Sequence, residues 1–205
     1  MSAISAKKYA ELSRSRLSPN FILRDFLFST DAAAAGHSNF PSDDADLVVK
    51  SGKQLCAQVL EPILAKFGRF AITFGYQARD MLDTPSQQAD LKYDRESSQP
   101  HQWDRGTHGK DVYARVDILP YCVEDGIVTK HDFGHWCMMN LDIDLLMQFP
   151  NSNVYCITIS PEPRRYWWEW THRENGSTKI VHMGKSYWEN EYPNLPFAQQ
   201  PKFHR

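Results

Sequence analysis

A stretch of helical periodicity from Ala45 to Phe67 constrains the fold more than any other feature of this sequence. Its apolar residues recur at the three-, four- and seven-residue spacings of a helix buried along one face, and they are Leu47, Val48, Leu55, Val59, Leu60, Ile63 and Leu64. Asp43 and Asp44 precede the stretch and suit a helix N-terminus. Pro62 is expected to kink the helix and Gly68 to end it.

Strand patterns dominate the chain after this helix. The predicted strands are 69–74, 112–120, 153–160 and the two arms of a hairpin, 165–172 and 179–183. Asn175-Gly176 between the arms is a strong hairpin signal, and a turn centred there places Glu169 opposite His182 and His172 opposite Lys179. Residues 136–149, rich in Met, Leu and Ile, are predicted to be helical.

The order of these patterns predicts an α+β fold, in which N-terminal helices pack on a small, mostly antiparallel sheet. A length of 205 residues suits one main domain. We expect residues 1–17 to be a flexible N-terminal segment, 18–189 to be the folded domain and 190–205 to be an extended tail. Residues 79–107 are polar and turn-rich, which is typical of a long loop that acts in specificity, either as a lid or hanging free.

Charge and hydropathy exclude several classes of protein. The 23 basic and 25 acidic side chains leave a net charge of -2, so no basic excess is present to neutralise nucleic-acid phosphates. No apolar run approaches the roughly 20 residues that span a bilayer. The N-terminus lacks the apolar region of a secretory signal, so we expect a cytoplasmic location and no membrane span. The oligomeric state is not predicted.

The four cysteines are widely spaced and form no C-x-x-C pair; they are Cys56, Cys122, Cys137 and Cys156. Each lies in an apolar neighbourhood, which indicates buried thiols in a reducing compartment. A disulfide between two of them is the alternative.

One set of residues is typical of a metal site. His108 precedes the strand that carries Asp117, and His172 lies on a separate strand with Glu169 three positions before it. Two imidazoles and one carboxylate with an open fourth position match a catalytic zinc site, at which Glu169 would be the general base. In the alternative interpretation His108 is a solvated turn residue, while Asp117 and Glu169 face solvent.

Several segments resemble zinc D-Ala-D-Ala carboxypeptidases, in the order and at about the spacing of that family. The N-terminal segments are 18–30, Asn39-Phe-Pro41, 59–68 and Ala71-Ile-Thr-Phe-Gly-Tyr-Gln-Ala78. The metal motifs S-x-H-x-x-G-x-A-x-D and E-x-x-H are approximated by Gly106-Thr-His-Gly109, Ala114-Arg-Val-Asp-Ile118 and Glu169-Trp-Thr-His172. The resemblance covers roughly residues 18–182 and extends to vancomycin-resistance dipeptidases, some phage endolysins and the hedgehog signalling domain, which share a small α+β fold.

The resemblance implies a zinc metallopeptidase of the D,D-carboxypeptidase or dipeptidase type. It would hydrolyse a peptide or amide bond, such as one in a peptidoglycan stem peptide. Zinc would be held by His108, Asp117 and His172, and Glu169 would deprotonate the attacking water. Wall peptides lie outside the cytoplasm, so a phage or prophage enzyme released by lysis would reconcile the substrate with the missing export signal.

The chain departs from the family motifs at two places and leaves the last ligand open. His108 and Asp117 are two positions further apart than the motif requires, and His101 with a longer insertion is the alternative first ligand. His182 is the alternative last ligand. Gln77 stands where the family usually carries an arginine for the substrate, and Gln77 cannot supply its charge or bidentate fork. Arg79, two residues on, is a candidate to replace it in substrate binding.

Two other functions remain open. The lost arginine and the altered spacing suit a non-catalytic protein that binds a ligand or partner on the same fold. A two-His-one-carboxylate set is also used by non-haem iron oxygenases. Their usual arrangement places the first His and the carboxylate two residues apart, which His108 and Asp117 do not match.

Overall fold

The fold comes from a computed structural model that describes a large part of the chain. The described residues are 6–36, 38–41, 44–78, 101–104, 112–149, 151–172 and 178–182. For 169–172 and 178–182 the structure describes the backbone alone. The predicted tail, 190–205, and most of the predicted loop, 79–107, lie outside these ranges.

The contacts divide the chain into two compact units. One contains Met1–Ala57 and Phe74–Val116, and the other contains Gln58–Thr73 and Asp117–Arg205. The α+β class predicted from the sequence is confirmed. The helical elements are α1 (Ala6–Ser13), η1 (Leu23–Phe26), α2 (Thr30–Ala35), α3 (Ala45–Leu55), η2 (Cys56–Leu60), α4 (Glu61–Phe67), α6 (Tyr121–Glu124) and α7 (Lys130–Asn140).

The predicted helix from Ala45 to Phe67 is present as α3, η2 and α4 in succession. Asp44 caps its N-terminus by accepting a hydrogen bond from the backbone N–H of Leu47 (2.9 Å). The middle segment, η2, is a π-helical turn that ends two residues before Pro62. Proline has no N–H to donate within a helix and its ring crowds the carbonyl four residues earlier, which accounts for the widened turn.

Trp103 is a buried residue of the first unit with several contacts to other segments of that unit. The indole ring is fully buried, contacts the ring of Phe26 (centroids 5.2 Å apart) and donates from Nε1 to the carbonyl of Arg115 (3.0 Å). Its own carbonyl accepts a hydrogen bond from the hydroxyl of Ser51 (3.2 Å). These contacts hold the short segment 101–104, and therefore His101, in a fixed position.

Helix α1 lies within residues 1–17, which the sequence predicts to be a flexible segment. The ring of Tyr9 in this helix packs against Phe40 with centroids 5.1 Å apart. Leu17, which follows the helix, is buried and lies against Gly52. The flexibility of residues 1–17 stays a prediction.

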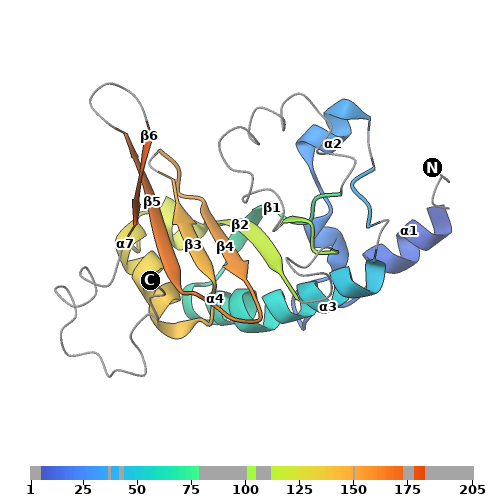
Figure 1. Cartoon of the computed structure of the whole chain (residues 1–205), viewed down its shortest axis with the longest axis horizontal. Helices are drawn as coiled ribbons and strands as arrows, with labels where there is room; N and C mark the ends of the chain where they lie inside the picture. The colour runs from blue at the N-terminus through green and yellow to red at the C-terminus, as the bar shows by residue number, and fades with distance from the viewer. Residues whose placement is uncertain are drawn as a thin grey trace. The chain divides into compact units, whose positions relative to one another are not determined.

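The sheet has the strand order β1-β2-β4-β3-β5-β6, as Figure 1 shows. Its strands are β1 (Phe70–Phe74), β2 (Ala114–Pro120), β3 (Leu145–Gln148), β4 (Tyr155–Ile159), β5 (Tyr166–His172) and β6 (Thr178–His182). The β3–β4 and β5–β6 pairs are antiparallel, whereas β3 and β5 are parallel. The sheet is therefore mixed. The non-consecutive neighbours β2 and β4 lie side by side in it.

Helices α4 and α7 pack together and against one face of this sheet. Phe133 of α7 contacts Phe67 of α4 (ring centroids 4.9 Å apart) and Tyr155 of β4 (4.7 Å). Gly134 of α7 lies directly over the ring of Trp167 in β5. Because side chains alternate along a strand, the residues between those that contact the helices belong to the other face.

Two expectations from the sequence are wrong in detail. The helix predicted over 136–149 begins earlier, at Lys130, and ends at Asn140, and 145–148 form strand β3. The hairpin register differs by one residue, because Glu169 pairs with Val181 and His172 with Thr178.

In the described part of the chain, no helix is both long enough and apolar enough to cross a membrane.

Candidate metal centre

Asp117 lies in the middle of β2, as the sequence predicts. Its neighbours Val116 and Ile118 are fully buried, whereas Asp117 itself is partly buried. Strand alternation therefore places its carboxylate on the opposite face of the sheet from these two side chains. The main-chain carbonyl of Asp117 accepts a hydrogen bond from the hydroxyl of Thr73 in β1 (3.2 Å), which fixes the strand at this point.

Cys156 is the second residue of β4, the strand next to β2 in the sheet. Its side chain is buried and its thiol forms no disulfide. Cys156 is paired across the sheet with Met147 and forms an apolar cluster with Met147 and Leu145. The thiol therefore has an apolar environment on the β3 side.

His101 is held by the chain segment that follows β1. Its Nδ1 lies 2.7 Å from the carbonyl oxygen of Gly75, and its own carbonyl accepts from the N–H of Gln77 (2.9 Å). The ring also makes an edge contact with Phe74 (centroids 4.6 Å apart). A carbonyl can only accept a hydrogen bond, so the proton is on Nδ1 and Nε2 carries the lone pair.

His101 is a neutral imidazole over the whole physiological range. Burial and the nearby positive charge of Arg115 lower its pKa to about 3, although the contact with Gly75 acts in the opposite direction. Neutral imidazole with Nδ1–H bound to a backbone carbonyl is the usual form of a histidine metal ligand.

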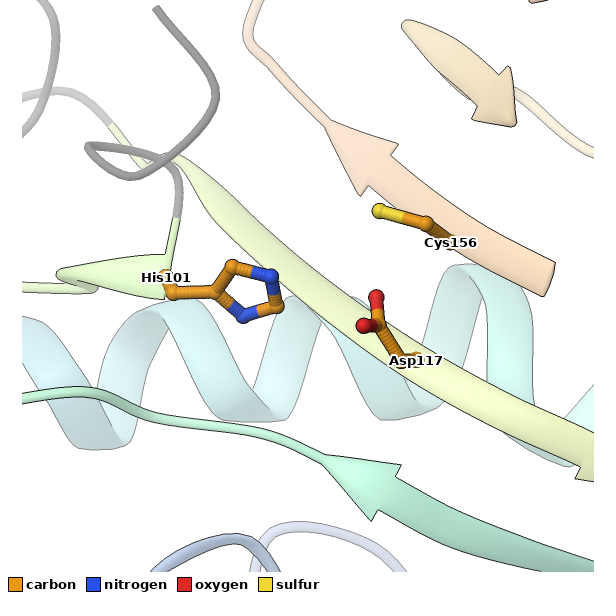
Figure 2. A group of neighbouring side chains, drawn as sticks. All are labelled: His101, Asp117 and Cys156. Carbon is orange, nitrogen blue, oxygen red and sulfur yellow. The ribbon is translucent and has the colours of Figure 1, made fainter. Parts of the chain in front are cut away.

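Figure 2 shows His101, Asp117 and Cys156 as one group of neighbouring side chains. Each offers one ligand atom, and these nitrogen, oxygen and sulfur atoms all lie within 4.8 Å of one another. Ligand atoms around a tetrahedral zinc ion stand roughly 3.5 Å apart, given metal–ligand bonds of about 2.0–2.3 Å. The three side chains thus have the chemistry and the proximity to bind one metal ion.

The sequence offers two of these residues as metal ligands and does not offer the third. Asp117 was the predicted carboxylate ligand, and His101 was the alternative to His108. Cys156 was interpreted only as a buried thiol, because a ligand on a non-consecutive neighbouring strand has no spacing signal in the sequence. The predicted ligand His108 and the predicted substrate-binding residue Arg79 lie outside the described residues.

The predicted catalytic base and last ligand lie elsewhere in the sheet. Glu169 and His172 are on β5, and the alternative ligand His182 is on β6. Strands β4 and β3 lie between β2 and β5, which separates the backbones of β2 and β5 by about 14 Å at a usual strand spacing. Since the structure does not describe the side chains of Glu169, His172 and His182, their roles stay predictions.

Gln77, the other predicted substrate-binding residue, is buried. Its described contact is the main-chain hydrogen bond to His101, and its role in substrate binding stays a prediction. Arg115 provides a positive charge in the same region. It is 4% exposed, its charge acts on His101, and it lies two residues before Asp117, hence on the same face of β2.

Comparison of the chain with protein-family models, with curated proteins and with solved structures finds no match. The resemblance to zinc D-Ala-D-Ala carboxypeptidases is therefore a prediction that rests on the sequence motifs. The possibility of a metal site comes from the three side chains themselves.

Proposed function

We propose that the protein is a metal-dependent hydrolase of peptide or amide bonds, with zinc as its cofactor. The observation that carries the proposal is the group formed by His101, Asp117 and Cys156, whose nitrogen, oxygen and sulfur ligand atoms lie within 4.8 Å of one another. The peptidase class is supported by the sequence motifs alone. A substrate of the stem-peptide type in bacterial cell walls follows from the same resemblance.

Three residues would hold the metal, each in a position fixed by its neighbours. His101 would bind through Nε2 while Gly75 fixes the ring from the other side. Asp117 would bind through its carboxylate and Cys156 through its sulfur. A divalent metal at such a site acts as a Lewis acid and lowers the pKa of bound water.

Arg115 is a candidate to bind an anionic group of the substrate. Its buried guanidinium group lies near His101 and on the Asp117 face of β2, as described above. A carboxylate at the end of a peptide pairs well with an arginine, and the pairing gains strength where water is excluded. Arg115 would then supply the charge that Gln77 lacks.

The test is hydrolysis of muropeptides and D-amino-acid dipeptides by the zinc-loaded protein. Asp117→Asn should lower turnover by at least about 100-fold, because a neutral amide is a much weaker metal ligand. Asp125→Asn, at an exposed position outside the group, is the matched control and should leave turnover unchanged. Glu169→Gln tests the predicted general base directly. Zinc-loaded protein that cleaves no substrate across the panel would refute the proposed activity.

A second candidate is a metal-binding protein without hydrolytic activity. Two strands lie between β2 and β5, so the backbone at Glu169 is distant from the backbone at Asp117. This separation favours a metal-binding protein without hydrolytic activity. Zinc retained at about one ion per chain, no turnover, and unchanged biological activity in Glu169→Gln would support this function over the first.

A further inference from the structure

The candidate centre has one sulfur atom, that of Cys156, among its possible ligand atoms. We propose that Cys156 binds the metal as a thiolate and makes the centre selective for zinc and other thiophilic divalent cations over magnesium, manganese and calcium. The inference depends on the metal site of the proposed function but not on hydrolysis. It concerns which ion the residues His101, Asp117 and Cys156 accept.

Cys156 is distinguished from the other cysteines by its neighbours. Among the described residues, Cys156 is the cysteine that groups with a histidine nitrogen and a carboxylate oxygen, all within 4.8 Å of one another. Cys122 and Cys137 lie near each other, and burial raises the pKa of both thiols. In Figure 2 the sulfur of Cys156 projects from its strand on the same side as the carboxylate of Asp117.

The donor set determines which cations can bind. Magnesium, calcium and manganese prefer carboxylate, carbonyl and water oxygens, and the group provides one such residue. Thiolate and imidazole ligands favour zinc and cobalt instead. One carboxylate and one thiolate also balance the charge of a divalent ion, because His101 binds as neutral imidazole.

The surroundings of Cys156 favour a strong metal–sulfur bond. Cys156 forms a buried apolar cluster with Leu145 and Met147, and the partly buried Phe149, Tyr166 and Trp168 pack against this cluster. An apolar shell excludes water and lowers the local dielectric constant, which strengthens the attraction between a thiolate and a cation. A thiol binds a metal as a thiolate, so metal binding through Cys156 would release one proton.

Cobalt spectroscopy tests the proposed thiolate ligand without any measurement of activity. The full chain loaded with cobalt should show a near-ultraviolet thiolate-to-cobalt charge-transfer band. Cys156→Ser should abolish the band, and Cys122→Ser should retain it. Competition titrations should show zinc binding at least about 100-fold more tightly than manganese. In Cys156→Ser, zinc affinity should fall by about 10- to 100-fold and manganese affinity should change little.

X-ray absorption of the zinc-loaded wild-type chain provides a test that needs no variant. One sulfur neighbour at about 2.3 Å supports the proposal, and a shell of nitrogen and oxygen alone overturns it. The proposal is also overturned if the cobalt band persists in a folded Cys156→Ser protein, or if manganese binds as tightly as zinc. Failure of the peptide assays alone refutes the hydrolase and leaves this proposal standing.

Discussion

At the scale of single residues, helix α7 carries a histidine, His135, whose pKa is shifted by its surroundings. His135 in α7 stacks on His131 one turn before it, with ring planes 6° apart and centroids separated by 6.3 Å. Burial and the charge of His131 lower the pKa of His135, although Asp132 acts in the opposite direction. The folded protein therefore resists protonation of His135 more than the unfolded chain does.

This shift predicts a loss of stability in mild acid. An unfolded histidine takes up its proton near pH 6.5, so the contribution of neutral His135 is complete above about pH 6.5 and is lost as the pH falls below it. His135→Gln should flatten the decline in the free energy of unfolding between about pH 6.5 and 5, measured by urea denaturation. His131→Gln should flatten it partly, since one of two causes of the shift is removed. Parallel declines in wild type and His135→Gln would contradict this assignment.

At the scale of elements, the contact between α7 and β5 depends on the absence of a side chain at Gly134. A Cβ there would lie 2.6 Å from Cζ2 of Trp167 and 3.0 Å from its Cη2, which is too close for either residue to remain in place. Alanine favours a helix over glycine by about 1 kcal/mol, so helix propensity and packing oppose each other at this position.

In the wild-type background, we expect the cost of overpacking to exceed the gain in helix propensity. Gly134→Ala is expected to lower the free energy of unfolding by about 1–3 kcal/mol, the usual result of overpacking, as measured by chemical denaturation. Trp167→Phe removes the ring atoms in conflict, so the same Gly134→Ala change made in that variant should be neutral or stabilising by up to about 1 kcal/mol. An equal loss in both backgrounds would show that the Trp167 contact is not the cause.

Elements with a regular local pattern could be predicted from the sequence, whereas element boundaries set by tertiary contacts could not. The helix from Ala45 to Phe67 has the right apolar period, an acidic cap and a terminal glycine, and the structure contains it. The region 136–149 is rich in apolar residues without a clear helical or strand period, so its pattern does not separate helix from strand. Tertiary pairing determines the structure of residues 145–148, because they pair with both β4 and β5 as a strand.

The register of the hairpin is another feature that could not be predicted from the sequence. The Asn175-Gly176 signal correctly predicts two antiparallel arms. A two-residue turn at Asn175-Gly176 would pair His172 with Lys179, but the strands pair His172 with Thr178. A shift of one residue changes every cross-strand partner. The sequence signal fixes the existence of the hairpin and not its pairing.

At the scale of the whole molecule, the candidate centre comes from sequence positions far apart. His101 precedes β2, Asp117 lies within it, and Cys156 is on β4, which neighbours β2 although β3 separates them in the chain. Sequence motifs could identify Asp117 and offer His101 as an alternative. They could not identify Cys156, because its proximity depends on the crossover in strand order.

A site assembled by folding in this way should stabilise the folded state when it binds metal. The unfolded chain does not hold the three side chains together, so zinc binds mainly to the folded protein. Zinc at about 100 times its dissociation constant adds about 2.7 kcal/mol of stability, which corresponds to a rise of roughly 5–10 °C in the thermal midpoint for a chain of this size. Differential scanning calorimetry measures this rise, and a chelator should reverse it.

His101→Asn is the sharpest variant for this test. The asparagine amide retains a donor for the carbonyl of Gly75 but removes the Nε2 ligand, so the unloaded variant should keep most of its stability. The zinc-induced rise should disappear in His101→Asn and persist in His131→Asn, whose histidine is outside the group. An equal rise in both variants would mean that zinc stabilises the molecule from another site. If the rise is lost in His101→Asn and kept in His131→Asn, zinc stabilises the folded chain by binding at the candidate centre.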